Sequence, residues 1–221
     1  MGEAMATNPP AGTGEAEPPA AARLRLFVAI ELPAAWRRYL AARAAELERL
    51  APGYARWVAP ELLHLTVVFL GEQPPAQRAA IERALRDATA RQAPFQLALG
   101  PLGHFGGAVP RVLWVGAHAS GHGLEALHAA VGAALAAEGV AFDRKPLVAH
   151  LTLGRARPGA DPAVGRRLAR QLPALPLPAA PPPFTVEALT LMRSELQPAG
   201  PRYTPLARFP LTPRAGRGTP T

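Results

Sequence analysis

The chain has 221 residues, 49% of them hydrophobic, so it is long enough to bury a core in one domain or in two small lobes. It contains no cysteine, which excludes disulfides, thiolate nucleophiles and zinc sites with cysteine ligands. The formal net charge is +8, carried almost wholly by arginine, since Lys145 is the only lysine. This bias fits either a GC-rich genome or a surface that attracts phosphates, for which the planar guanidinium is well suited.

Neither end of the chain has the pattern of a folded element or of a targeting signal. Residues 1–22 and 213–221 are rich in small residues and proline without periodicity, so we predict two disordered tails. No apolar run approaches the roughly 18 residues of a membrane span, and the N-terminus lacks the basic-then-apolar order of a signal peptide. We therefore expect one folded domain at residues 23–212, in a cytoplasmic protein without a membrane partner.

The first half of this domain predicts two long strands and two helices in alternation. Residues 23–30 have the apolar pattern of a strand, and a helix that begins at Pro33 follows. Trp57 lies in a short extended piece before the second long strand, residues 61–72. Pro74 and the proline after it then open the next helix, in which apolar side chains recur among Arg and Glu.

The second half predicts the remaining elements around a second copy of the same pattern. The predicted elements are strands at 95–99 and 111–115 joined by a glycine-rich loop, a helix at 124–138, a strand at 147–155, a helix capped by Asp161, a proline-rich extended connector at 173–183, and strands at 184–192 and 203–211. Pro205 and Pro210 predict an edge position for the last strand, because proline cannot donate to a neighbouring strand. About seven or eight strands and four helices indicate an α+β domain.

A His-x-Thr motif occurs twice, each time inside an apolar strand, as His64-Leu65-Thr66 and His150-Leu151-Thr152. Residues i and i+2 of a strand point to the same face, so each histidine shares a face with its threonine. The opposite faces, which we expect to be buried, carry Leu63, Leu65, Val67 and Phe69 in the first copy and Ala149, Leu151 and Leu153 in the second. The repeat predicts two similar halves, each presenting one polar pair to a cleft.

Two histidines that face one cleft are suited to acid–base chemistry, because an unperturbed imidazole titrates near pH ~6.5. One ring can accept a proton from water while the other donates a proton to a leaving oxygen. Thr66 and Thr152 add hydroxyl groups that suit the non-bridging oxygens of a phosphate. The pattern therefore favours in-line displacement at phosphorus, with His64 and His150 on opposite sides.

Two other interpretations of the motifs stay open at this point. A lone His-x-Thr in a strand is common and usually structural, although two copies in matching contexts are harder to dismiss. A metal site is the other interpretation, since histidine is the commonest transition-metal ligand. Neither His64 nor His150 has a carboxylate at i+2 or i+4, and the chain lacks cysteine, so we expect no metal and no cofactor.

Other residues that carry chemistry fit structural roles better. We expect Trp36 and Trp114 in the core, His128 in half-buried packing on its helix, and His104, His118 and His122 in surface loops. Strict alternation puts Gly154 on the cleft face, where the absence of a side chain would let a substrate approach closely. It puts Arg155 on the core side, so Arg155 reaches the cleft only if the strand ends or bulges near Gly154.

These residues and their flanks resemble the RNA 2′,3′-cyclic phosphodiesterases, historically called 2′-5′ RNA ligases, of the two-histidine phosphoesterase superfamily with its paired HXTX motifs. The resemblance runs from Arg23 to Leu211. Besides the two motifs, the segments that carry it are Arg25–Ala29, Trp57-Val58, Phe69–Glu72, Arg111–Trp114, Arg155, Arg193–Leu196 and Tyr203–Leu211.

The resemblance implies a fold and an activity. The fold would be two pseudo-symmetric lobes, each an antiparallel sheet backed by helices, with a central cleft. The activity would be metal-independent hydrolysis of RNA 2′,3′-cyclic phosphate ends, or of small cyclic nucleotides, to 2′-phosphates by a monomer. Ligation of 2′,5′ RNA ends would be the reverse of the same chemistry.

The resemblance also implies roles for individual residues. Carried over, His64 is the proton donor and His150 the proton acceptor, although the symmetry of the two motifs makes these roles exchangeable. The remaining implied site residues are Thr66 and Thr152, which would hold the phosphate, and Phe27, Arg155 and Tyr203, which would bind the phosphate or the nucleobase.

Functions of two other kinds remain possible from the sequence. One is an RNA-binding module that keeps the cleft and its arginine-rich rim but turns over little; substitution of either histidine would distinguish it from an enzyme. The other is a related two-histidine esterase for a different cyclic phosphate, such as ADP-ribose 1″,2″-cyclic phosphate, which a panel of substrates would identify.

Overall fold

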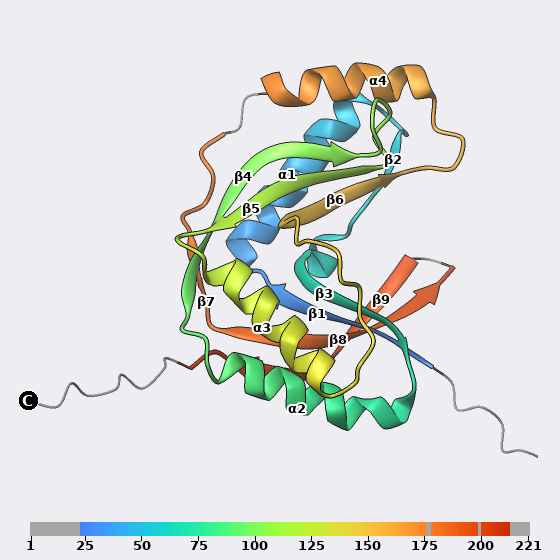
Figure 1. The fold of residues 1–221 in the computed structure, drawn as a ribbon. Coiled ribbons are helices and arrows are strands. Elements are labelled where there is room, and N and C mark those ends of the chain that lie inside the picture. Colours follow the sequence, from blue (N-terminus) through green and yellow to red (C-terminus); the bar gives the residue numbers. More distant parts are fainter. Residues whose placement is uncertain (1–22, 176–177, 199, 213–221) are drawn as a thin grey trace, which may run out of the picture.

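A computed structural model describes residues 23–175, 178–198 and 200–212. The two predicted tails and two positions of the proline-rich connector lie outside the described residues. The described chain forms two antiparallel sheets, drawn one above the other in Figure 1, and each sheet is backed by helices. No helix in this part of the chain is both long and apolar enough to cross a membrane.

The lower sheet of Figure 1 and its two helices make up what we call the first lobe. Its strand order is β3-β1-β8-β9, with β1 at Leu24–Glu31, β3 at His64–Gln73, β8 at Ala188–Gln197 and β9 at Gly200–Pro210. Helices α2 (Arg78–Thr89) and α3 (Gly123–Ala137) pack against this sheet and against each other. The predicted apolar residues of α2, Ile81 and Leu85, are fully buried there.

The upper sheet and its helices make up the second lobe. Its strand order is β2-β6-β5-β4-β7, with β2 at Ala55–Trp57, β4 at Phe95–Phe105, β5 at Val112–Ala119, β6 at His150–Ala156 and β7 at Phe184–Val186. Helix α1 (Ala34–Leu50) follows Pro33 as predicted and buries Trp36, Leu40 and Leu47. Helix α4 (Pro162–Gln171) is capped by Asp161, whose carboxylate accepts a hydrogen bond from the backbone N–H of Ala163. Short 3₁₀ turns occur at Pro60–Leu62, Pro75–Gln77 and Leu172–Ala174.

Along the chain, consecutive strands change sheet four times: between β1 and β2, β2 and β3, β3 and β4, and β7 and β8. β4 follows α2 of the first lobe but pairs with β5 in the second, and β8 follows β7 of the second lobe but pairs with β1 in the first. The single strand predicted at 184–192 is therefore wrong, because Glu187 separates β7 and β8, which belong to different sheets. Side-chain alternation continues past Glu187, so periodicity alone does not reveal the change of partner strand.

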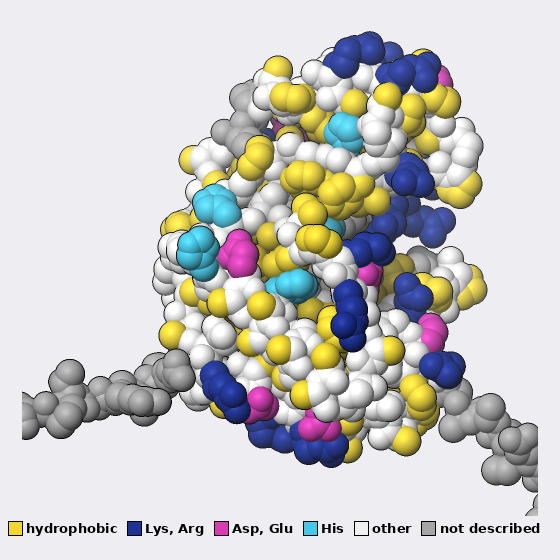
Figure 2. Space-filling model, viewed as in Figure 1, with side chains coloured by type: hydrophobic (Ala, Val, Ile, Leu, Met, Phe, Trp, Pro, Cys, Tyr) yellow, Lys and Arg dark blue, Asp and Glu magenta, His cyan; other side chains and the backbone are white. Residues whose placement is uncertain are grey.

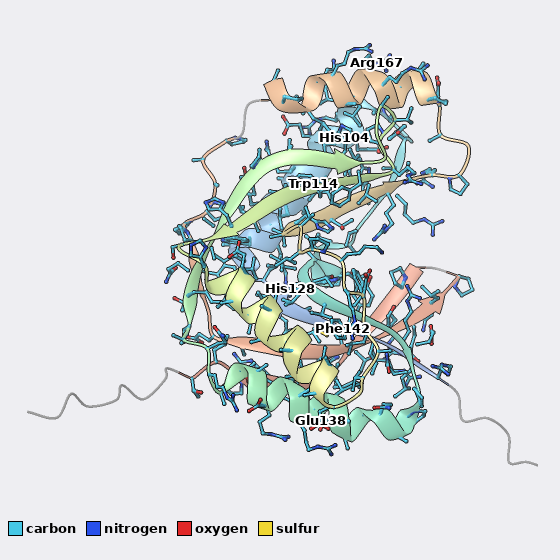
Figure 3. All side chains as sticks on the ribbon, viewed as in Figure 1. His104, Trp114, His128, Glu138, Phe142 and Arg167 are labelled. Carbon is cyan, nitrogen blue, oxygen red and sulfur yellow. The ribbon has the colours of Figure 1, made fainter. Side chains whose placement is uncertain are left out.

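The prediction for the last strand is confirmed, whereas the prediction of a glycine-rich loop is wrong. β9 lies at the edge of the first sheet, as its prolines predict. The loop predicted around His104 is wrong, because β4 continues through it and pairs His104 with Leu113 of β5. Gly103 is what makes the strand possible here, since a Cβ at this position would overlap the ring of Trp114 on the neighbouring strand. Figure 3 shows His104 and Trp114 in this part of the second lobe.

The other histidines outside the motifs lie largely where the sequence predicts. His128 is half-buried on α3, and Figure 3 shows it on the helix. His122 is exposed at the start of α3. His118 is exposed too, but it lies in β5 rather than in a loop.

Candidate active site

Each motif strand contains a β-bulge directly after its threonine. In β3 the extra residue is Val67, whose two neighbours pair with consecutive residues of β1. In β6 the extra residue is Leu153, whose two neighbours pair with consecutive residues of β5. A bulge places two successive side chains on the same side and reverses the alternation beyond it. The two lobes therefore repeat the bulge as well as the motif.

The bulges overturn two predictions that assumed strict alternation. Phe69, predicted to be buried, is 47% exposed, because the bulge turns it away from the core. Gly154, predicted on the cleft face, is buried on the core side, where a Cβ would lie 2.7 Å from the ring of Trp57. Arg155 meets the condition set for it: the strand bulges at Leu153, next to Gly154, and the Arg155 side chain is exposed on the same face as His150. Phe69 and Arg155 are thus equivalent positions of the two lobes.

The two motif histidines are held in the same tautomer by the same local contact. Nδ1 of His64 lies 2.7 Å from the carbonyl oxygen of Leu62, and Nδ1 of His150 lies 2.7 Å from that of Val148. A carbonyl oxygen only accepts, so each Nδ1 carries a proton and donates it. In the neutral ring Nε2 is then the unprotonated nitrogen, the atom that can take a proton from a substrate or water.

The threonines of the two motifs lie on the histidine faces, as predicted. Thr66 Oγ1 lies 3.1 Å from Nε2 of His64, so its hydroxyl can donate to the neutral ring or accept from the protonated ring. Thr152 is half-buried and pairs across the sheet with Trp114 of β5. The Thr66 hydroxyl therefore stands beside Nε2 of His64, and Thr152 lies on the same strand face as His150.

Aromatic rings enclose His64 in the first lobe. Its ring centroid lies 4.8 Å from that of Phe27 and 5.2 Å from that of Tyr203, the latter edge-on. Phe27 is only 4% exposed, so it supports the imidazole from beneath rather than offering an open face to a nucleobase. Tyr203 is half-buried and remains partly accessible.

Aromatic rings enclose His150 in the second lobe as well. Its ring lies 4.9 Å from Phe105, edge-on, and 6.2 Å from Trp114. Trp114 is not in the core as predicted: it is half-buried on the face that carries Thr152, with its benzene ring lying over Gly103. In strand 111–115 Trp114 alternates with the buried Leu113 and Val115, and this pattern already places it on the opposite face.

The two lobes bring the motif strands close together. Residues of β3 and β6 approach to Cα–Cα distances of 8 Å or less, although the strands belong to different sheets. The N–H of Val58, in the segment leading into β3, donates to the carbonyl oxygen of Leu153 at 2.8 Å. Figure 2 shows the surface hollowed between the lobes at the right, with Lys and Arg side chains bordering the hollow.

Comparisons with known proteins agree with this arrangement. Residues 32–198 match the model of the 2′-5′ RNA ligase superfamily. The chain belongs to the 2′-5′ RNA ligase superfamily.

Within this superfamily, three similar proteins show the extent of the likeness. An RNA 2′,3′-cyclic phosphodiesterase of Thermus thermophilus is 34% identical over 88% of this chain and 93% of its own length. One of Geobacillus stearothermophilus is 32% identical over 86% of this chain, and the match spans 58% of that longer protein. A crystal structure of Escherichia coli LigT complexed with 3′-AMP superposes with a TM-score of 0.66 at 30% identity, covering 87% of this chain and 99% of LigT.

In this superfamily member the pKa values of His64 and His150 are both lowered, and by similar causes. Burial is the largest cause that lowers the pKa of His64 and of His150, and each backbone carbonyl contact opposes it in part. The positive charge of Arg155 lowers the pKa of both rings further, and that of His64 is also lowered by charge on His150. Arg155 is therefore the positive charge whose effect the two rings share.

A pocket opens beside His64 on the first lobe. Its lining residues are Phe27, Glu31, Arg37, Glu61, Leu62, Leu63, His64, Met192, Tyr203 and Pro205. Glu31, Arg37 and Glu61 come from β1, α1 and the 3₁₀ turn before the motif, and the sequence did not predict them as site residues. Burial raises the pKa of Tyr203, and the positive charges of Arg155 and Arg25 partly offset this.

The structure thus assembles the predicted residues into two matching groups. His64 and Thr66 stand with Phe27 and Tyr203, and His150 and Thr152 stand on the same face as Arg155. Phe105 and Trp114, which enclose His150, were missed as site residues. Among the described residues, no three His, Asp or Glu side chains gather as a metal site would require.

Proposed function

We propose that this protein hydrolyses 2′,3′-cyclic phosphates at RNA ends to 2′-phosphates by acid–base catalysis between His64 and His150. The observation that carries the proposal is the matched pair of imidazoles: each donates its Nδ1 proton to the carbonyl two residues earlier, which leaves Nε2 as the nitrogen that exchanges protons. Curated relatives of nearly the same length act on RNA 2′,3′-cyclic phosphates by name, and LigT has been crystallised with 3′-AMP. One chain supplies both histidines, so a monomer suffices.

The two histidines take different roles because their surroundings differ. In this reaction the bond from phosphorus to the 3′ oxygen breaks, and that oxygen stays with the nucleoside. The pocket beside His64 is the place for the nucleoside, so protonated His64 donates its Nε2 proton to the departing 3′ oxygen. His150 is the more exposed ring, and its neutral Nε2 takes the proton of the attacking water as the new phosphorus–oxygen bond forms.

The remaining site residues bind the phosphate and the nucleoside. The hydroxyls of Thr66 and Thr152 donate to its non-bridging oxygens, and the guanidinium of Arg155 stabilises the negative charge that grows there. Tyr203, at the mouth of the nucleoside pocket, contacts the nucleoside. Phe27 positions His64 from beneath, a role that replaces the direct substrate contact implied by the resemblance.

The lowered pKa of His64 opposes the donor role in the empty cleft, because burial favours the neutral ring. The bound phosphate diester carries a negative charge beside the ring, and an opposite charge at short range raises the pKa of an imidazole. Substrate binding therefore prepares His64 as an acid. Consequently the pH limbs of kcat, which report the complex, lie at higher pH than those of kcat/KM, which report the free protein.

The experiment that tests the proposal is hydrolysis of an oligoribonucleotide that ends in a 2′,3′-cyclic phosphate, in excess EDTA, with identification of the phosphate isomer formed. A 2′-phosphate product, absent with His64→Ala and His150→Ala, is the expected result. Binding without turnover would favour an RNA-binding module. Turnover of ADP-ribose 1″,2″-cyclic phosphate alone would favour the related esterase, and loss of activity in EDTA would contradict metal-free catalysis. Ligation is checked by adding an oligoribonucleotide with a 5′-hydroxyl end, whose oxygen would attack the cyclic phosphate in place of water and form a 2′-5′ linkage as the bond to the 3′ oxygen breaks.

A further inference from the structure

Two arginines stand directly opposite each other on the rim of the cleft. Arg56 of β2 pairs with Arg155 of β6 in the antiparallel ladder. Trp57, the next residue along β2, packs over Gly154 on the core side, so Arg56 points to the other side, which is the cleft face. Arg155 points to the same side because of the bulge. Both residues are exposed.

This arrangement is unfavourable in the free protein. Like charges directly opposite on neighbouring strands are destabilising, and backbone pairing fixes the two Cα positions, so the side chains separate only by bending away. Other arginines have acidic partners, including Arg78 with Glu82 and Arg83 with Glu138. In the part of the chain that the structure describes, neither Arg56 nor Arg155 forms a salt bridge. Two exposed arginines on paired positions without a carboxylate partner are suited to bind an external anion.

The two arginines lie at different depths of the cleft. The charge of Arg155 lowers the pKa of His64 and His150, and it also reaches Tyr203 at the mouth of the nucleoside pocket. Arg56 lies one strand further out, on the edge strand β2, about 4.8 Å from β6 between backbones. Arg155 therefore borders the reacting phosphate, whereas Arg56 suits a phosphate beyond it.

We propose that Arg56, together with Arg155, binds the phosphate on the 5′ side of the terminal nucleoside, so that the preferred substrate is an RNA strand rather than a cyclic mononucleotide. This proposal rests on the proposed function and names its substrate class. In this proposal the nucleoside occupies the pocket beside His64, whose lining includes Tyr203, and its 5′ phosphate extends toward the arginine pair. The bound phosphate neutralises the repulsion between the two guanidinium groups, which a mononucleotide leaves in place.

The test compares two substrates across two variants. The substrates are a cyclic 2′,3′-mononucleotide and a short oligoribonucleotide that ends in a 2′,3′-cyclic phosphate. The variants are Arg56→Gln and, as the matched control, Arg86→Gln, which removes an equally exposed arginine from α2 of the other lobe. We expect Arg56→Gln to lower kcat/KM about tenfold for the oligonucleotide and less than twofold for the mononucleotide, while Arg86→Gln changes neither.

A salt titration gives a second readout that a merely structural role would not move. Loss of one phosphate contact reduces the slope of log kcat/KM against log salt by about 0.7 for a single strand, and only with Arg56→Gln and the oligonucleotide. The thermal midpoint of Arg56→Gln stays equal or rises, because a like-charge pair is removed. If Arg56→Gln lowers kcat/KM equally for both substrates, or for neither, the proposal is overturned.

Failure of the proposed function is distinguishable from failure of this inference. If the unmodified protein hydrolyses neither substrate, the proposed function fails, and binding of a fluorescent oligoribonucleotide with a 3′-terminal phosphate replaces kcat/KM as the measurement. Weaker binding by Arg56→Gln than by Arg86→Gln then supports the arginine site, and equal binding overturns it.

Discussion

The two lobes are alike in what holds each histidine and unlike in what lies just beyond it. Both have a His-x-Thr strand, a bulge after the threonine, a carbonyl on Nδ1 and two aromatic rings around the imidazole. After the bulge the first lobe has Phe69 and the second has Arg155. Under the proposed function, the shared features hold the two imidazoles that transfer protons, and the differing features orient the substrate in the cleft.

The largest expected effect comes from removing either histidine. His64→Ala and His150→Ala should each lower kcat by about 10²- to 10⁴-fold, because each removes one proton-transfer step, while much of the substrate affinity remains. Steady-state kinetics and equilibrium binding of a 2′-phosphate product measure the two quantities. His122→Ala, an exposed histidine at the start of α3, is the control and should be unchanged. Retained activity in one of the two motif variants would show that the lobes are not equivalent.

Substitution of the two motif threonines should have the next largest effect and tests whether both lobes bind the phosphate. Thr66→Val and Thr152→Val keep the side-chain shape but remove a phosphate donor, so we expect about a 10²-fold loss of kcat from each. Thr66 also contacts Nε2 of His64, and its removal should disturb the pH profile in addition to the rate. Unchanged kinetics in both variants would exclude the threonines from phosphate binding.

Arg155 is the position at which the lobes differ most in charge, and its removal should move the pH dependence. Its positive charge lowers the pKa of His64 and His150, so Arg155→Gln should raise both pKa values. A higher pKa keeps the donor protonated to higher pH and delays deprotonation of the base, so both limbs of the kcat/KM profile shift to higher pH. NMR titration of the two imidazoles measures the shifts directly. A downward shift, or an equal upward shift in Arg86→Gln, would contradict this explanation.

The smallest expected effect comes from disturbing Trp114, one of the two aromatic rings beside His150 in the second lobe. Gly103→Ala forces a Cβ into the ring of Trp114, so we expect a loss of about 1–3 kcal/mol in the free energy of unfolding and a displaced indole beside His150. Gly132→Ala is the matched control, because its Cβ would lie at an ordinary 3.5 Å from Phe142 on a helix that favours alanine. Chemical denaturation compares the two, and equal stability would mean that the indole moves freely.

Much of the fold was predictable because its signals are local. The strands of the motifs, the helix after Pro33, the cap at Asp161 and the edge strand with Pro205 each follow from side-chain periodicity or from the chemistry of one residue. The predictions failed where pairing with a neighbouring strand decides the local structure. Glu187 separates two strands that continue one alternating pattern, and His104 lies in a strand because Gly103 makes room for Trp114.

The sequence by itself determined the pair of motifs, the face that each His shares with its Thr, and the superfamily to which these residues point. Only the tertiary structure decided the bulges, and with them the exposure of Phe69, the burial of Gly154 and the place of Arg155 in the cleft. A bulge is a property of two paired strands, in which one has a residue more than the other, so a single strand's pattern does not contain it. The same holds for Arg56 and Arg155, which are distant in the chain and become neighbours only through the register of β2 and β6.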